Sequence, residues 1–136
     1  MKRGDQMDLQ NYVGYFKEMR NREIEWTATD REDGILQMGY PKYDSLMLKF
    51  SQEFLESSYC DPHYRKTLKQ HHIKLKVNHS TVGKVMLAKE RKLIEAMLTL
   101  IIRSEPFDEG SWAKALQEGY FYRLTDALIS LEEEKV

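Results

Sequence analysis

The segment from residue 93 to residue 102 constrains the fold more than any other part of the chain, because it is apolar at nearly every position. A helix that is hydrophobic all round is surrounded by other elements. The run is much shorter than the ~18 apolar residues that suggest a membrane span. We therefore expect residues 93–102 to form the central, buried helix of a globular domain.

Apolar spacing and capping residues predict further helices around this one. One stripe combines Met47, Phe50, Phe54 and Leu55, which we expect to be buried together. The first three predicted helices cover about residues 8–24, 44–58 and 61–72. A fourth, long helix begins between residues 80 and 88 and ends near 103, a short one covers 111–119, and the last one runs through Leu131. The sequence thus predicts an all-α, compact bundle of five or six helices.

The chain has 136 residues, which fits one domain over residues 1–136. We expect disordered tails at 1–7 and 132–136. Residues 73–77 alternate apolar and basic side chains, which favours an edge strand or an extended connector. Residues 35–38 are similar, and the two segments pair in one interpretation, although an isolated two-stranded piece is only marginally stable.

Composition excludes several classes of protein. Cys60 is the single cysteine, so the chain has no intramolecular disulfide and no cysteine-based zinc site. Residues 1–5 carry two basic residues but no apolar stretch after them, which argues against a signal peptide. The formal net charge of −1 gives no global field toward nucleic acid or anionic lipid. We expect a cytoplasmic protein without a membrane role.

Motifs for catalysis or cofactor binding are weak. The chain has neither a Gly-x-Ser-x-Gly elbow nor a phosphate-binding loop. Asp61, next to Cys60, opposes a reactive thiolate. His71 and His72 point about 100° apart on a helix and cannot share one metal ion without distortion. We expect no catalytic residue, no metal and no cofactor, and consider an enzyme less plausible than a binding protein.

Charge is distributed unevenly along the chain. Residues 63–92 hold nine Lys or Arg against one acid, whereas residues 105–136 hold eight acids against three bases. One interpretation is a basic surface that neutralises phosphates. The other is that the acidic segment cancels it, within the molecule or across a dimer. The candidate nucleic-acid-binding residues are Lys66, Lys69, Lys74, Lys76, Lys84 and Arg91.

Arg103 and Glu105 flank the predicted end of the central helix and form a candidate polar corner. Pro106 breaks the helix, and Gly110 permits a turn. We expect Phe107 to fold back onto the helix. The corner is interpreted either as a helix-to-helix turn with an ion pair or as a polar pocket.

The residues around this corner resemble the sequence signature of a known protein family. The run from Leu98 to Leu128 resembles the C-terminal signature of a family of small uncharacterised bacterial and phage-encoded proteins: a hydrophobic helix, Arg-Gly-Glu-Arg-Phe, a glycine, a short helix, another glycine and a leucine-spaced helix. The matching positions are Arg103, Glu105, Phe107, Gly110, Gly119, Leu124 and Leu128, with a similar Tyr40-Pro41-x-Tyr43 upstream. Ser104 and Pro106 depart from the pattern. The resemblance implies a fold and a bacterial or phage setting, without an activity.

The leading functional hypothesis is a non-catalytic protein-interaction domain that binds a partner or forms a homodimer. Exposed aromatics in residues 26–43 and the acidic tail are its expected anchors. The alternative is a nucleic-acid-binding accessory protein that uses the basic segment 63–92.

Overall fold

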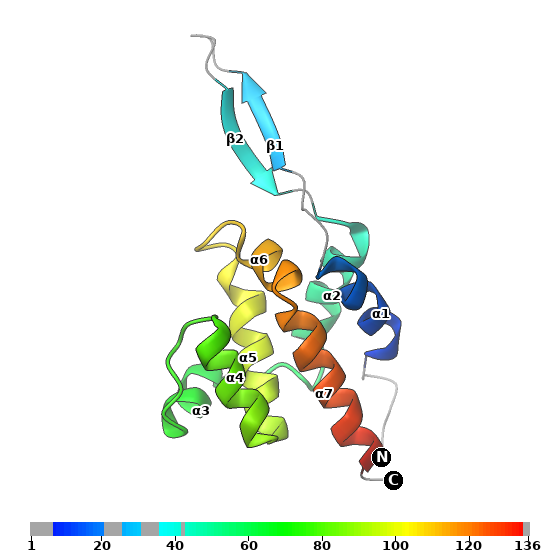
Figure 1. Cartoon of the computed structure of the whole chain (residues 1–136), viewed down its shortest axis with the longest axis vertical. Helices are drawn as coiled ribbons and strands as arrows, with labels where there is room; N and C mark the ends of the chain where they lie inside the picture. The colour runs from blue at the N-terminus through cyan, green and yellow to red at the C-terminus, as the bar shows by residue number, and fades with distance from the viewer. Residues whose placement is uncertain (1–6, 21–25, 31–35, 42, 135–136) are drawn as a thin grey trace.

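A computed structural model describes the backbone of residues 7–20, 26–30, 36–41 and 43–134, and helices dominate it. The all-α prediction is confirmed (Figure 1). The elements are α1 (Gln10–Met19), β1 (Trp26–Asp30), β2 (Leu36–Pro41), α2 (Ser45–Glu56), α3 (Tyr64–Gln70), α4 (His79–Ala88), α5 (Arg91–Ser104), α6 (Ser111–Gln117) and α7 (Tyr120–Glu134).

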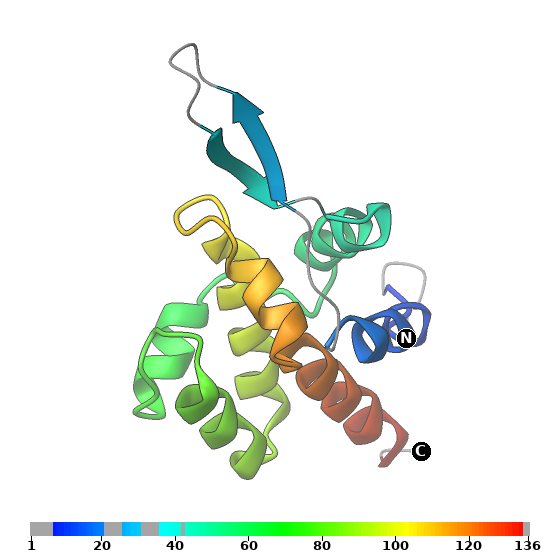
Figure 2. The same ribbon diagram turned by 45° about the horizontal axis from the view of Figure 1, so that its top comes forward.

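Helix α5 lies at the centre of the bundle. It contacts α2, α3, α4, α6 and α7, and it runs between the α3–α4 side and α7 (Figures 1 and 2). Leu98 and Ile101 are completely buried, as are the neighbouring Ala96 and Met97. The prediction that residues 93–102 form the central buried helix is confirmed. The physical reason is that α5 carries apolar side chains on most sides, so other elements must cover it on most sides.

A cluster of aromatic rings joins α1, α2 and α7 into the second half of the core. Phe16 stacks on Phe121 with ring centroids 5.1 Å apart and meets the edge of Phe50 at 4.8 Å. Tyr12, also on α1, meets the Phe50 ring edge-on with ring centroids 5.2 Å apart. Such edge-to-face and offset pairs stabilise aromatic clusters beyond the area that they bury. These contacts attach the N-terminal helix to the C-terminal one.

The described residues contain seven helices, one more than the highest predicted number. The predicted long helix ending near 103 is divided into α4 and α5 at Lys89, whose φ is 53°. Glu90 then adopts an extended conformation before α5 begins. A left-handed residue ends a helix, and neither glycine nor proline marks this position in the sequence.

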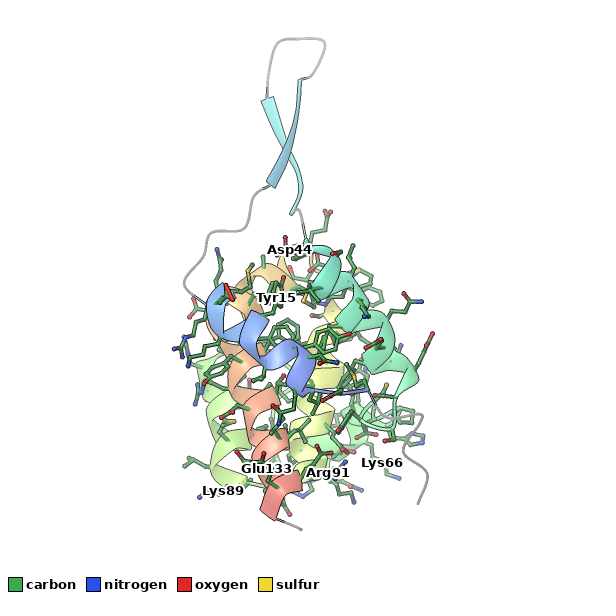
Figure 3. All side chains as sticks on the ribbon, turned by 90° about the vertical axis from the view of Figure 1, so that its right-hand side faces the viewer. Tyr15, Asp44, Lys66, Lys89, Arg91 and Glu133 are labelled. Atoms are coloured by element: carbon green, nitrogen blue, oxygen red, sulfur yellow. The ribbon has the colours of Figure 1, made fainter. Side chains whose placement is uncertain are left out.

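A two-stranded piece is present, but residues 36–41 pair with residues 26–30 and not with the predicted segment 73–77. β1 and β2 pair as an antiparallel hairpin with Ala28 opposite Met38. The hairpin extends from one end of the bundle (Figures 1 and 3). Ile73 is not in a strand. Its N–H bonds to the carbonyl of Leu68, and His72 is left-handed, so Ile73 is the buried residue that follows the C-terminal turn of α3.

Two apolar side chains are more exposed than the sequence predicted. Leu55 is 41% exposed, although Met47, Phe50 and Phe54 of the same helix are fully buried. Phe107 is 88% exposed and does not fold back onto α5. Leu55 follows Phe54 by about 100° around α2, which takes it beyond the edge of the buried stripe.

The predicted tails differ from the structure where they are described. Met7 is buried, while residues 1–6 lie outside the described ranges. α7 continues through the expected tail as far as Glu134, and Glu132 accepts a hydrogen bond from Tyr59 at 2.6 Å. Every described helix is too short or too polar to qualify as a membrane span.

Candidate functional site

The turn between α5 and α6 is organised by the carboxylate of Glu105. One oxygen accepts hydrogen bonds from the Trp112 N–H at 2.9 Å and from the Tyr43 hydroxyl at 2.9 Å. The other oxygen accepts from the Gly110 N–H at 3.0 Å. Gly110 has a φ of 93°, a conformation that favours glycine. Glu105 thereby joins the end of one helix to the start of the next and fixes the intervening loop.

Tyr43 connects this turn to the segment that precedes α2. Its hydroxyl donates to Glu105 and accepts from the Ala113 N–H at 3.0 Å. Burial raises the pKa of Tyr43 well above its usual range, and the bond to the Glu105 carboxylate raises it further. The phenol therefore stays protonated and acts as a neutral donor.

Trp112 covers the last carbonyls of α5. Its indole N–H is 3.1 Å from both the Ile101 and the Ile102 carbonyl oxygens. Its ring lies 5.2 Å from that of Tyr43. Carbonyls at a helix C-terminus lack intrahelical partners, so this side chain completes the end of the buried helix.

The predicted polar corner is a tightly bonded turn rather than an ion pair. Arg103 is exposed, and no ion pair between it and Glu105 is found in the described part of the chain. Because both oxygens of Glu105 already accept hydrogen bonds, the carboxylate is occupied in holding the turn.

A groove with a cavity volume of about 570 Å³ lies beside the turn, and we call it the corner groove. Ile102 is buried and Trp112 is half-buried, while Leu55 and Phe107 are exposed large apolar side chains. The volume falls in the range of about 300–1,000 Å³ that is usual for binding pockets. The residues that line it are Ser51, Leu55, Tyr64, Arg65, Ile102, Arg103, Glu105, Pro106, Phe107 and Trp112.

Sequence reasoning identified only part of this groove. Arg103 and Glu105 were candidates, but Leu55, Tyr64 and Arg65 were not. The groove forms from α2, the start of α3 and the α5–α6 turn, segments that only tertiary packing brings together. The one available signal was Phe107 itself, an aromatic residue in a loop bounded by Pro106 and Gly110.

The predicted nucleic-acid-binding residues divide into two groups. Lys66, Lys69, Lys74, Lys76 and Lys84 are exposed, and no ion pair to a described residue involves them. Arg91 is half-buried and pairs with Glu95 at 2.8 Å and with Glu132 at 3.5 Å. Lys66, Lys89 and Arg91 lie toward the end of the bundle opposite the hairpin (Figure 3).

Among the described residues, two ion pairs join the acidic segment to the basic one. Glu132 contacts Arg91, and Glu118 contacts the His79 ring at 2.8 Å. His71 lies near Glu90 instead, at 3.5 Å. Cancellation of the basic segment by the acidic one is thus local, and the five lysines named above are outside it. Within the described ranges, no group of three potential ligands is arranged for a metal ion.

We expect the Tyr43→Phe variant to lose about 1 kcal/mol of unfolding free energy near neutral pH, because Glu105 and the Ala113 N–H lose a half-buried hydrogen-bond partner. The folded pKa lies above the unfolded value of 10.0, so the contribution of Tyr43 is complete below pH 10 and decreases as the pH rises. Above about pH 10 the wild type should lose stability through this proton, whereas the variant has no phenol to ionise at this position. Urea unfolding, monitored by circular dichroism at several pH values, should show that the difference in unfolding free energy between wild type and variant decreases above pH 10. A gap that is constant with pH would contradict the account.

Comparison with known proteins places the chain in a family but attaches no activity to it. No curated protein and no solved structure matches the chain significantly. A family match extends over residues 1–134, which includes the helical bundle, the hairpin and the corner groove. The chain therefore belongs to the family described as a family of unknown function, DUF6508.

Proposed function

We propose that this chain is a non-catalytic protein-interaction domain and that the corner groove is its docking surface. The observation that carries the proposal is Phe107, which is 88% exposed at the edge of an open groove. A concave surface lined by apolar and aromatic side chains with a few polar groups is typical of binding sites. Burial of a Phe side chain contributes about 1.5–3 kcal/mol, which a partner would supply.

The loop around Phe107 is held in place, which favours binding. The Phe107 and Asp108 N–H groups both donate to the Ser104 carbonyl, at 3.0 and 2.9 Å. Glu105 and Gly110 close the other side of the loop. A loop whose backbone is ordered before binding loses less conformational entropy when a partner covers it.

The same geometry argues against catalysis at this corner. The oxygens of Glu105 are engaged by Tyr43, Gly110 and Trp112, so they are poorly available to a substrate. Arg103 supplies a positive charge, but a guanidinium stays protonated and cannot act as a general acid or base here. We accordingly propose a binding role without a cofactor or metal, in the cytoplasm of a bacterium or in a phage-encoded setting, with a protein partner or a second copy of the chain as the target and no membrane role.

The interface residues that we propose from the structure differ from those that the sequence predicted. Tyr43 is directed into the turn, where it bonds to Glu105. Glu132 of the acidic tail is engaged by Tyr59 and Arg91. The side chains of residues 26–41 lie outside the described part of the chain. Among the described side chains, Leu55 and Phe107 are the anchors of the proposed interface. The aromatic side chains of residues 26–41 stay an untested prediction.

Selection of binders from a random library of displayed peptides tests this function. We expect Phe107→Ala and Leu55→Ala each to weaken the selected peptides about tenfold or more, the loss that is typical of an interface anchor. Leu87→Ala is the matched control, because Leu87 is 83% exposed on α4 and does not line the groove. Failure to select any peptide, or equal binding by all variants, would contradict the proposal.

Nucleic-acid binding is the second candidate, favoured by the five exposed lysines that have no acidic partner among the described residues. Lysines neutralise phosphates, and the released counterions make such binding depend steeply on salt. Two of them, Lys74 and Lys76, lie in the connector between α3 and α4. The candidate set loses Arg91, which is engaged by two carboxylates.

If this second function holds, retention on heparin falls steeply between about 50 and 200 mM salt. Combining Lys74→Glu with Lys76→Glu should abolish retention. A control pair, Lys17→Glu with Lys49→Glu, changes the net charge equally at exposed positions of α1 and α2 and should retain most of it. Absence of retention at low salt would exclude the basic surface as a phosphate-binding site.

A further inference from the structure

We infer that the partner of the corner groove is an acidic amphipathic peptide segment, in which Asp or Glu residues flank an apolar anchor. This inference rests on the proposed docking function and specifies the chemistry of its target. The inference is based on the positive charges of Arg65 and Arg103, which line the groove together with the apolar residues Leu55 and Phe107.

Both arginines are available to a partner. Each is exposed, and within the described ranges neither forms an ion pair. Arg65 is held against its neighbour: its Nε donates to the Tyr64 hydroxyl at 3.3 Å, and the guanidinium carbon lies 5.7 Å from the Tyr64 ring. A planar guanidinium that is already oriented is well suited to bidentate contact with a carboxylate.

Glu105 is the one acid among the residues that line the groove, and it forms an ion pair with neither arginine. Glu105 accepts hydrogen bonds from two backbone N–H groups and the Tyr43 hydroxyl, and these donors stabilise its negative charge inside the turn. The groove thus offers apolar contact area with two arginines at positions open to solvent. Complementary charge at the rim of an interface sets specificity and the rate of association.

An isolated acidic group or a simple polyanion does not fit this arrangement as well. The apolar lining of Leu55, Ile102, Phe107 and Trp112 gains nothing from a phosphate backbone or a free carboxylate. A peptide that presents a leucine or an aromatic side chain between acidic residues uses both features. The chemistry therefore favours a protein segment over nucleic acid at this particular surface.

The test is a peptide selection run in parallel on the wild type and on the double variant Arg65→Glu, Arg103→Glu. Peptides of about a dozen residues selected on the wild type should be enriched in Asp and Glu around a Leu, Phe, Tyr or Trp. These peptides should bind the double variant about tenfold or more weakly, and selection on the double variant should enrich Lys and Arg instead. Lys17→Glu with Lys49→Glu, which changes net charge equally away from the groove lining, should leave the preference acidic.

Separate outcomes distinguish the inference from the function on which it depends. Peptides that need Phe107 but show no acidic preference would overturn the partner chemistry and leave the docking function intact. Peptides that bind independently of Phe107 would overturn both. Displacement of the peptides by a single-stranded DNA oligonucleotide as effectively as by free peptide would overturn the inference in favour of a polyanion surface. A wild-type dimer in light scattering that the arginine double variant dissociates would overturn it in favour of a second copy as the occupant.

Discussion

Burial of α5 is the constraint on which the rest of the structure depends. Leu98 and Ile101 have no exposed surface, and five other helices contact α5. Because apolar side chains occupy most of its circumference, no arrangement with α5 on an outer face would keep them from water. The positions of α3, α4, α6 and α7 follow from the need to cover it. The aromatic cluster around Phe16 then attaches α1 and α2 to the same core.

The corner groove is a consequence of how the buried helix ends. Trp112 bonds to the last carbonyls of α5, and Glu105 fixes the start of α6 through its contacts with Gly110 and Tyr43. These bonds hold the loop so that Phe107 stays in solvent beside α2 and α3. A stable turn and an exposed aromatic side chain thus have one structural origin, which connects the core of the domain to its proposed docking surface.

The sequence predicted the elements that depend on local pattern and missed those that depend on tertiary contact. The apolar run of α5, the stripe of Met47, Phe50 and Phe54, and the turn at Gly110 were readable because periodicity and turn chemistry are local. The division at Lys89 carries no glycine or proline signal. Tertiary packing brings Leu55 beside α3 and the α5–α6 turn in the corner groove. Glu105 likewise finds its donor Tyr43 across 62 positions of sequence. No motif spacing encodes such partners.

Native-state hydrogen exchange, resolved residue by residue, tests the central position of α5 most directly. The amides of residues 97–102 should exchange only through global unfolding, with a protection free energy equal to the unfolding free energy measured in urea. Amides of the short peripheral helix α3 should exchange through smaller openings. If the α5 amides exchanged as fast as those of α3, the helix would not be the innermost element and the account of the fold would be wrong.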